Sequence, residues 1–146
     1  MDLDELYQEI ILDHYKKPRH FRKLSEAEAM VDEENPTCGD HIRLNAGVGE
    51  GRLTSIDVDC EGCAICTASA SMMAEKVLGD EVVKVRELIR RFNDMMRGGE
   101  ELSEEELGDL VALKGVRKFP LRIKCATMPW HGLKAALDQL ESETRS

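Results

Sequence analysis

Two short stretches of alternating apolar side chains, joined by a glycine-rich turn, restrict the fold of this chain more than any other feature. Apolar side chains occupy every second position in residues 42–48, and the same alternation returns in residues 56–60. A period of two is that of a strand with one buried face, and "GEG" at residues 49–51 can turn the chain between the two stretches. The sequence therefore predicts an antiparallel β-hairpin.

Helical patterns lie on both sides of the predicted hairpin. Pro18 ends the first pattern, and Pro129 is expected to start, kink or break part of the last one. Ser103 and Glu106 resemble a capping box that opens a short helix. The charged residues 19–36 are interpreted as a connector. The helical patterns cover residues 3–14, 64–78, 82–96, 103–113 and 120–140.

The order of a helix, then strands, then helices predicts an α+β fold. Helices are expected to pack on one face of a small antiparallel sheet of about three strands. A length of 146 residues fits one domain with a hydrophobic core of its own. We therefore expect a single domain over residues 1–146, with a frayed, charged tail from about residue 141.

The balance of charge and hydropathy argues against two classes of partner. The chain has 29 acidic and 20 basic residues, a formal net charge of −9, whereas a nucleic-acid binder needs a basic stripe. No run approaches the ~18 apolar residues of a membrane span. The acidic, amphipathic N-terminus fits no signal or transit peptide. We expect a cytoplasmic protein that binds neither nucleic acid nor membrane.

The cysteines are the main candidates for chemistry. Five cysteines, an odd number in a chain of cytosolic character, favour metal binding or thiol chemistry over a disulfide scaffold. Cys38, Cys63 and Cys125 each fall near the end of a predicted element, and "NPTCGD" seats Asp40 two positions after Cys38. Together these four side chains would supply the ligands of a tetrahedral zinc ion. The alternative is three buried cysteines, since free cysteine is among the most buried residue types.

The run "CEGCAIC" leaves the roles of two further cysteines open. Cys60, Cys63 and Cys66 are spaced as in the ferredoxin motif, but the fourth cysteine of that motif is replaced by Ser69. Cys60 continues the inward alternation of its strand, and Cys66 is either a neighbour of the metal site or part of the core. A structural role is favoured for both. The histidines, each more often not a ligand when taken alone, are His14, His20, His41 and His131.

Three cysteine motifs carry a family likeness. "NPTCGD", "EGCAICTASASMM" and "RIKCATMPW" resemble the motifs of the SufU and IscU (NifU-like) iron–sulfur assembly proteins. "LYQEIILDHYKKPRH" is similar to the N-terminal helix of the same family, so the likeness covers about residues 3–140. Lys124 stands where IscU-type proteins carry a histidine, and the interval between the second and third motif is longer than theirs. Both features look like the SufU branch.

The resemblance implies a ligand set and a chemistry. It carries the ligands over as Cys38, Asp40, Cys63 and Cys125, with Cys38 as the sulfur acceptor. SufU-type proteins bind zinc there and accept persulfide sulfur from the cysteine desulfurase SufS, whereas IscU-type proteins assemble a [2Fe–2S] cluster. Arg122 and Lys124 are candidates to stabilise negative charge beside Cys125, or are solvated helix charges.

Three functions remain open at this point. The first is a zinc-dependent sulfurtransferase that works with a cysteine desulfurase of the SufS or IscS type. The second is a non-enzymatic scaffold on which iron and sulfide assemble before transfer to cluster-accepting proteins. The third is a small protein in which zinc only stabilises the fold. The same thiolates bind both metals, so the sequence does not separate these functions.

Overall fold

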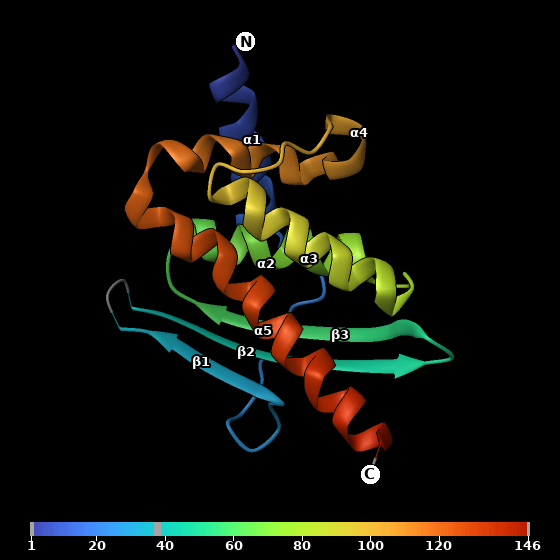
Figure 1. Cartoon of the computed structure of the whole chain (residues 1–146). Helices are drawn as coiled ribbons and strands as arrows, with labels where there is room; N and C mark the ends of the chain where they lie inside the picture. Colours follow the sequence, from blue (N-terminus) through green and yellow to red (C-terminus); the bar gives the residue numbers. More distant parts are fainter. Residues whose placement is uncertain (1, 37–38, 146) are drawn as a thin grey trace.

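The computed structural model describes residues 2–36 and 39–145. One helix is followed by three strands and then by the remaining helices, which confirms the predicted α+β class (Figure 1). The elements are α1 Leu3–Lys16, β1 Val31–Asn35, β2 Asp40–Gly49, β3 Arg52–Glu61, α2 Ala64–Val77, α3 Val82–Met96, α4 Glu104–Leu107, the 3-10 helix η1 Gly108–Lys118, and α5 Pro120–Arg145.

The three strands form one antiparallel sheet in the order β1-β2-β3. β2 and β3 are the predicted hairpin. Glu50 and Gly51 lie between these strands with φ values of 52° and 77°, as the two central residues of a type I′ turn do. This turn continues the twist of the strands, and a register shift between Gly47 and Val48 then brings Ile42 opposite Cys60 at the far end of the hairpin.

β1 lies inside the segment interpreted as a connector, so that interpretation is wrong for residues 31–35. Val31 pairs with Leu44 of β2, and the strand forms one edge of the sheet. Val31 is also the single buried residue of β1. A charged edge strand with one buried side chain produces no alternation, and the sequence therefore gives no signal for it.

α2 is the central helix of the layer that covers the sheet. Its residues from Cys66 to Ala74 are all buried, so the helix is enclosed on every side. It packs against α1, α5, η1 and β3. The alanines and serines of this helix are small enough to let these neighbours approach closely. The N-terminal end of α2 follows directly after β3, and that junction is where the predicted cysteine site lies.

α5 crosses the sheet as one helix and neither starts nor ends at Pro129 (Figure 1). Contacts on both sides of this proline hold the helix in place. Ser69 of α2 donates its hydroxyl to the carbonyl of Ala126 and accepts the indole N–H of Trp130 at 3.1 Å. The Trp130 ring also stacks on Phe92 of α3, with ring centroids 4.4 Å apart. Tertiary packing thus offsets the hydrogen bond that a proline removes from a helix.

The segment after α3 begins as predicted and continues differently. Ser103 and Glu106 form a complete capping box at the start of α4. Gly108, at φ 56°, ends that helix, and the chain continues to Lys118 as a 3-10 helix rather than as an α-helix. A positive φ is accessible to glycine without steric penalty, which explains the early end.

The C-terminal helix extends beyond the residue at which a frayed tail was expected, because α5 is helical to Arg145. Arg86 of α3 donates to Asp138 at 2.8 Å and to Glu141 at 3.0 Å, which ties the last turns of α5 to α3. These pairs are partly exposed, so each contributes little by itself.

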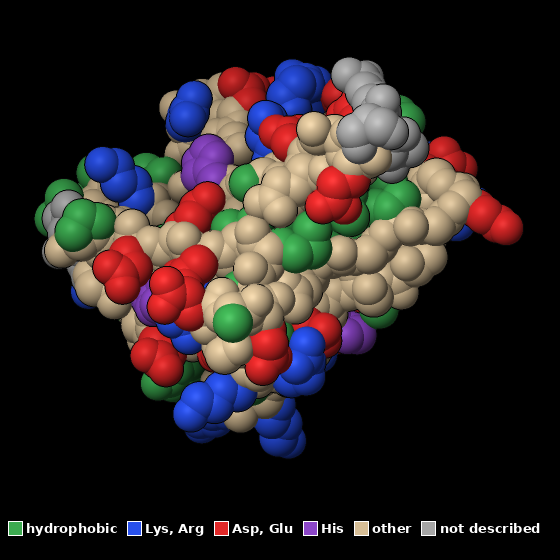
Figure 2. Space-filling view, turned by 90° about the horizontal axis from the view of Figure 1, so that it is seen from below, with side chains coloured by type: hydrophobic (Ala, Val, Ile, Leu, Met, Phe, Trp, Pro, Cys, Tyr) green, Lys and Arg blue, Asp and Glu red, His purple; other side chains and the backbone are tan. Residues whose placement is uncertain are grey.

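Charged side chains of both signs share the surface. Figure 2 shows acidic and basic groups intermixed on the face seen from below the sheet, a mixture typical of solvated surface. Each helix within residues 2–36 and 39–145 is too short or too polar to cross a lipid bilayer.

Candidate metal centre

Asp40 opens β2 and is fully buried. Its Oδ1 accepts the backbone N–H of Cys63 at 2.8 Å, and its Oδ2 lies 3.8 Å from the Cys63 sulfur. A buried carboxylate is destabilised unless it is hydrogen-bonded, paired or bound to a metal. The carboxylate is thus held against the N-terminal end of α2, facing the thiol that the sequence also singled out.

Gly62 makes this approach possible. Its φ is +148°, and a Cβ added there would lie 2.1 Å from Asp40 Oδ1 and 2.9 Å from Asp40 Cα. No side chain fits at such distances, so a residue larger than glycine would displace the carboxylate or the backbone. The glycine between the hairpin and α2 is therefore part of how the centre is built.

Cys63 and Cys125 complete a set of three candidate ligands. Cys63 is the N-cap residue of α2, and Cys125 is buried in the second turn of α5. The Asp40, Cys63 and Cys125 ligand atoms all lie within 4.8 Å of one another. Two thiols and one carboxylate are ligand types that zinc accepts, and thiolates also bind iron. The donor set fits either metal, and the helix N-terminus favours negative charge at Cys63.

Cys38, the fourth predicted ligand, lies outside the described residues. The neighbouring Gly39 has φ +76°, its N–H donates to the carbonyl of Asn35 at 2.8 Å, and a Cβ there would meet no atom within 4 Å. The structure therefore brings together three of the four predicted ligands, and the role of Cys38 stays a prediction.

Arg122 faces the metal centre and Lys124 does not. The Arg122 guanidinium donates to the Cys125 sulfur, which raises the pKa of Arg122, and the negative charges of Cys63 and Cys125 act in the same direction. Lys124 instead lines a separate groove together with Asn35 and Pro36. Of the two cations flanking Cys125 in the sequence, Arg122 is the one placed to stabilise negative charge there.

Cys60 and Cys66 form a pair of their own. Cys60 ends the inward face of β3, Cys66 is buried in the first turn of α2, and their sulfurs are 3.2 Å apart. The hydrogen bond from Cys66 lowers the pKa of Cys60, and the same bond together with burial raises the pKa of Cys66. Among the described residues, neither thiol belongs to the group of converging ligands. This agrees with the structural role that the sequence favours for both cysteines.

His14 is a functional candidate whose surroundings the sequence did not indicate. It is fully buried, its Nδ1 lies 2.8 Å from the Ser71 hydroxyl, and its Nε2 lies 2.8 Å from an Asp109 carboxylate oxygen. His14, Asp109 and Glu75 form the second group of side chains whose ligand atoms converge. These residues are up to 95 positions apart, so sequence spacing carries no signal for them.

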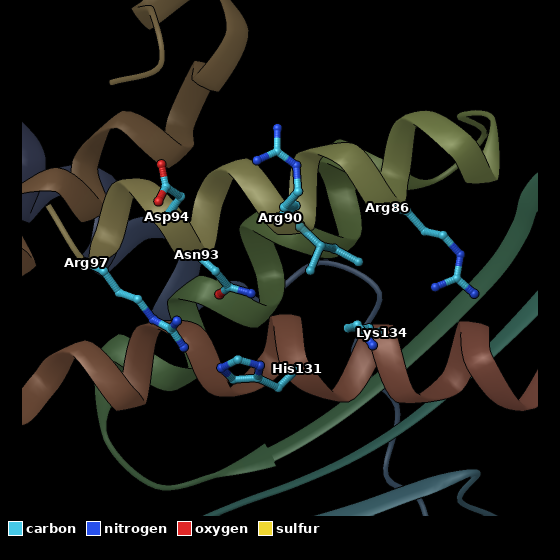
Figure 3. A pocket seen from close by; sticks show the side chains of 8 residues that line it. Arg86, Arg90, Asn93, Asp94, Arg97, His131 and Lys134 are labelled. Atoms are coloured by element: carbon cyan, nitrogen blue, oxygen red, sulfur yellow. The ribbon is translucent and has the colours of Figure 1, made fainter. Parts of the chain in front are cut away.

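His41 and His131 lie away from both groups. His41 is partly exposed beside Asp32 on the solvent face of the sheet, as its place in the strand predicts. His131 lies in a groove of about 560 Å³ between α3 and α5 (Figure 3). Arginine and lysine side chains reach this groove from both helices, and none of the three converging metal ligands lines it.

The chain is similar to proteins of iron–sulfur cluster assembly. The family model described as the NifU-like N-terminal domain matches residues 6–126. A zinc-dependent sulfurtransferase SufU from Bacillus subtilis is 42% identical over 140 residues, which are 96% of this chain and 95% of that protein. An iron–sulfur cluster assembly scaffold protein IscU from Streptococcus pyogenes is 42% identical over 135 residues, which are 92% of this chain and 84% of that protein.

The fold has a close counterpart among solved structures. A crystal structure of a hypothetical protein superposes with a TM-score of 0.82 at 41% sequence identity, covering 93% of this chain and 99% of that one. Sequence and fold thus agree over nearly the whole chain.

Proposed function

This chain belongs to the family of NifU-like N-terminal domains, and we propose that it acts in iron–sulfur cluster assembly as a zinc-dependent sulfurtransferase. The observation that carries the proposal is the convergence of Asp40, Cys63 and Cys125 within 4.8 Å. The similarity to the B. subtilis SufU supports the choice of zinc and of sulfur transfer. We place this activity in the cytoplasm, where thiols stay reduced.

Zinc would be held by Asp40, Cys63 and Cys125, together with Cys38 as the proposed fourth ligand. Bound zinc would keep these thiols deprotonated near neutral pH, which is the form that attacks sulfur. Other residues of the chain position the ligands and balance their charge. The Cys63 N–H positions Asp40, and Arg122 places a positive charge against the Cys63 and Cys125 sulfurs.

The proposed transfer moves one sulfur atom from a cysteine desulfurase of the SufS or IscS type. The Cys38 thiolate attacks the outer sulfur of the desulfurase persulfide and forms a new S–S bond. The old S–S bond breaks, and its electron pair leaves with the desulfurase cysteine, which takes up a proton. The product is a persulfide on Cys38. Cys38 lies two positions before Asp40 in the sequence, with Gly39 between them.

A second candidate function is supported by the S. pyogenes IscU, which is equally similar at 42% identity and is named a scaffold. In this function Cys38, Cys63 and Cys125 hold iron and sulfide as cargo and pass a [2Fe–2S] cluster to recipient proteins. The same three thiolates suit both cargo iron and resident zinc, so the donor set is compatible with each.

Anaerobic purification and a desulfurase assay distinguish the sulfurtransferase function from the scaffold function. Sulfurtransferase function predicts about one zinc per chain without visible absorbance, and several-fold faster cysteine turnover by a SufS-type desulfurase when the chain is added. The Cys63→Ser variant is the negative control. A coloured iron–sulfur chromophore, with desulfurase turnover unchanged, would instead establish the scaffold.

The Asp40→Ala variant tests the ligand assignment itself. Carboxylate oxygen binds a soft metal less firmly than thiolate does, so zinc affinity should fall, yet by less than in a cysteine variant. If a cluster is bound, it should live longer, since the exchangeable ligand is gone. Zinc affinity and cluster lifetime are compared with those of Asp40→Asn, which keeps an oxygen that can accept the Cys63 N–H. Unchanged zinc affinity and cluster lifetime in Asp40→Ala would show that Asp40 only caps the turn.

A further inference from the structure

Two thiols lie beside the metal centre without belonging to it. Cys60 and Cys66 stand three residues before and three residues after Cys63, one at the end of β3 and the other in the first turn of α2. The chain between these two residues turns at Gly62 and brings the two thiols together, with their sulfurs 3.2 Å apart. Both are free thiols rather than members of a disulfide.

The two thiols differ in access and in hydrogen bonding. Cys66 is fully buried, whereas Cys60 is partly exposed. The two sulfurs share a hydrogen bond, and the bonds that Cys60 makes with Cys66 and Thr67 lower the pKa of Cys60. The accessible Cys60 sulfur is placed to meet an incoming persulfide, and the buried Cys66 sulfur lies 3.2 Å behind it.

The metal centre is close to this pair. The charges of Asp40 and Cys63 both act on Cys66, and the charge of Asp40 acts on Cys60. The two sulfurs need to approach by only about 1 Å to reach the S–S length of ~2.05 Å in a disulfide. Such a pair can supply two electrons to a sulfur atom that arrives at the centre.

We propose that Cys60 and Cys66 form a redox-active dithiol that reduces persulfide sulfur delivered to the metal centre and releases it as sulfide. The inference rests on the proposed sulfur-transfer function, and it gives that function a product which iron can bind directly. It adds a persulfide-reducing activity to the transfer of sulfur.

The reaction balances in two steps. In the first, the Cys60 thiolate attacks the outer sulfur of a persulfide R–S–SH. The S–S bond breaks, R–S⁻ leaves and takes up a proton, and Cys60 becomes a persulfide. In the second, Cys66 attacks the Cys60 Sγ, its proton passes to the leaving HS⁻, and a Cys60–Cys66 disulfide forms. The outer sulfur gains two electrons, and the dithiol loses them.

A single-turnover experiment tests this inference. The reduced, zinc-loaded full chain is mixed with a low-molecular-weight alkyl persulfide, and sulfide release and intact mass are followed after rapid alkylation. We expect about one sulfide per chain together with a disulfide that maps to Cys60 and Cys66 by peptide analysis. A disulfide that maps to any other pair, with Cys60 and Cys66 both alkylated, would overturn the inference.

Matched variants assign the two roles. Cys66→Ser should stop the reaction after the first step and accumulate a persulfide on Cys60, with at least tenfold less sulfide. Cys60→Ser should give neither the persulfide nor the disulfide. Cys66→Ala repeats the first test without a buried hydroxyl, in case the serine variant folds poorly. Sulfide release that is unchanged in the double variant Cys60→Ala/Cys66→Ala would refute the inference.

The test of the dithiol can be distinguished from the test of the proposed sulfurtransferase function. Zinc content and desulfurase acceleration are measured on the same preparations. Loss of both in the parent chain would defeat the sulfurtransferase proposal, while the small persulfide would still report on the dithiol. Conversely, a chain that accelerates the desulfurase yet forms no Cys60–Cys66 disulfide would refute the dithiol alone.

Discussion

Two polar clusters adjoin helix α2, and they differ in the residue types that form them and in the hydrogen bonds of those residues. At its N-terminal end lies the metal centre of Asp40, Cys63 and Cys125. Farther along lies the α1 cluster, in which His14 and Asp109 meet Ser71 and Glu75 of α2. Each cluster brings together ligand types from three separate elements, so convergence by itself does not decide which of them holds a metal.

The polar side chains of the α1 cluster are already engaged in hydrogen bonds and ion pairs. Both ring nitrogens of His14 have hydrogen-bond partners at 2.8 Å, one in Ser71 and one in Asp109. Glu75 is paired with the Arg19 guanidinium at 3.4 Å, so this carboxylate already has a partner. The Ser71 hydroxyl also accepts the backbone N–H of Arg19, so the cluster fastens the end of α1 to α2.

The metal centre has the opposite arrangement. Two of its three members are thiols, which hydrogen-bond weakly and gain far more from a metal than from a polar neighbour. The Cys63 sulfur lies 3.8 Å from Asp40, a long contact beside the 2.8 Å bonds of His14. We infer that the bonds within the α1 cluster stabilise the fold, whereas the converging thiols and carboxylate of the metal centre are placed to bind a metal.

The largest effect should come from removing one thiolate at the metal centre. Cys63→Ser and Cys125→Ser should each lower zinc affinity at least tenfold, about 1.4 kcal/mol or more, and abolish sulfur acceptance. Cys38→Ser should do the same if it is the fourth ligand. Metal analysis after dialysis measures this, with Cys60→Ala as the control that keeps its zinc. Full zinc occupancy in any of the three serine variants would remove that residue from the ligand set.

Gly62→Ala should affect both the fold and the metal centre. The added Cβ would clash with Asp40 at a position of positive φ, so we expect a loss of about 3 kcal/mol in unfolding free energy and weaker zinc binding. Gly51→Ala is the matched control, since it also has positive φ but open space around it. That variant should lose only about 1 kcal/mol and keep its zinc. Equal losses in the two variants would show that backbone strain, and not the Asp40 contact, is what matters.

His14→Ala is the converse test on the α1 cluster. It leaves a cavity and unpaired polar groups at a fully buried position, so the unfolding free energy should fall by about 2–3 kcal/mol with zinc content unchanged. Urea denaturation and metal analysis on the same sample give both quantities. Asp109→Asn, whose side chain is half exposed, should lose less than about 1 kcal/mol. Loss of zinc in His14→Ala would mean that the α1 cluster, too, binds metal.

Much of the fold follows from local sequence, and the exceptions have physical causes. The hairpin, α2 and α3 were predictable because their periodicity or composition matches their burial. β1 was not, since an edge strand buries a single side chain. The continuity of α5 through Pro129 depends on contacts with α2 and α3 that no local pattern encodes.

Some residues of the candidate site could likewise be predicted from the sequence, and others could not. Cys63 and Asp40 could be singled out because short motifs place them at the ends of predicted elements. The pairing of Cys60 with Cys66 could not be read from C-x2-C-x2-C spacing, because it depends on how tightly the chain turns between β3 and α2. The environment of His14 is assembled from α1, α2 and η1, and its partners are identified only by the tertiary structure.

The smallest effect is expected from pH at the edge of the α1 cluster. The hydrogen bond from Arg19 lowers the pKa of Asp13 below its ordinary value of 3.8, so this carboxylate stabilises the folded state above that pH. The contribution disappears as the pH falls through the lowered pKa, because both states are then protonated. Asp13→Asn should therefore have a slightly lower urea midpoint than the parent at neutral pH, and the difference should vanish in strong acid.

Zinc should leave the metal centre at a higher pH than the lowered pKa of Asp13, since protons compete with the metal for the Cys63 and Cys125 thiolates. An Asp13→Asn difference that persists below the lowered pKa, or zinc that stays bound until the chain unfolds in acid, would break the contrast between the two clusters.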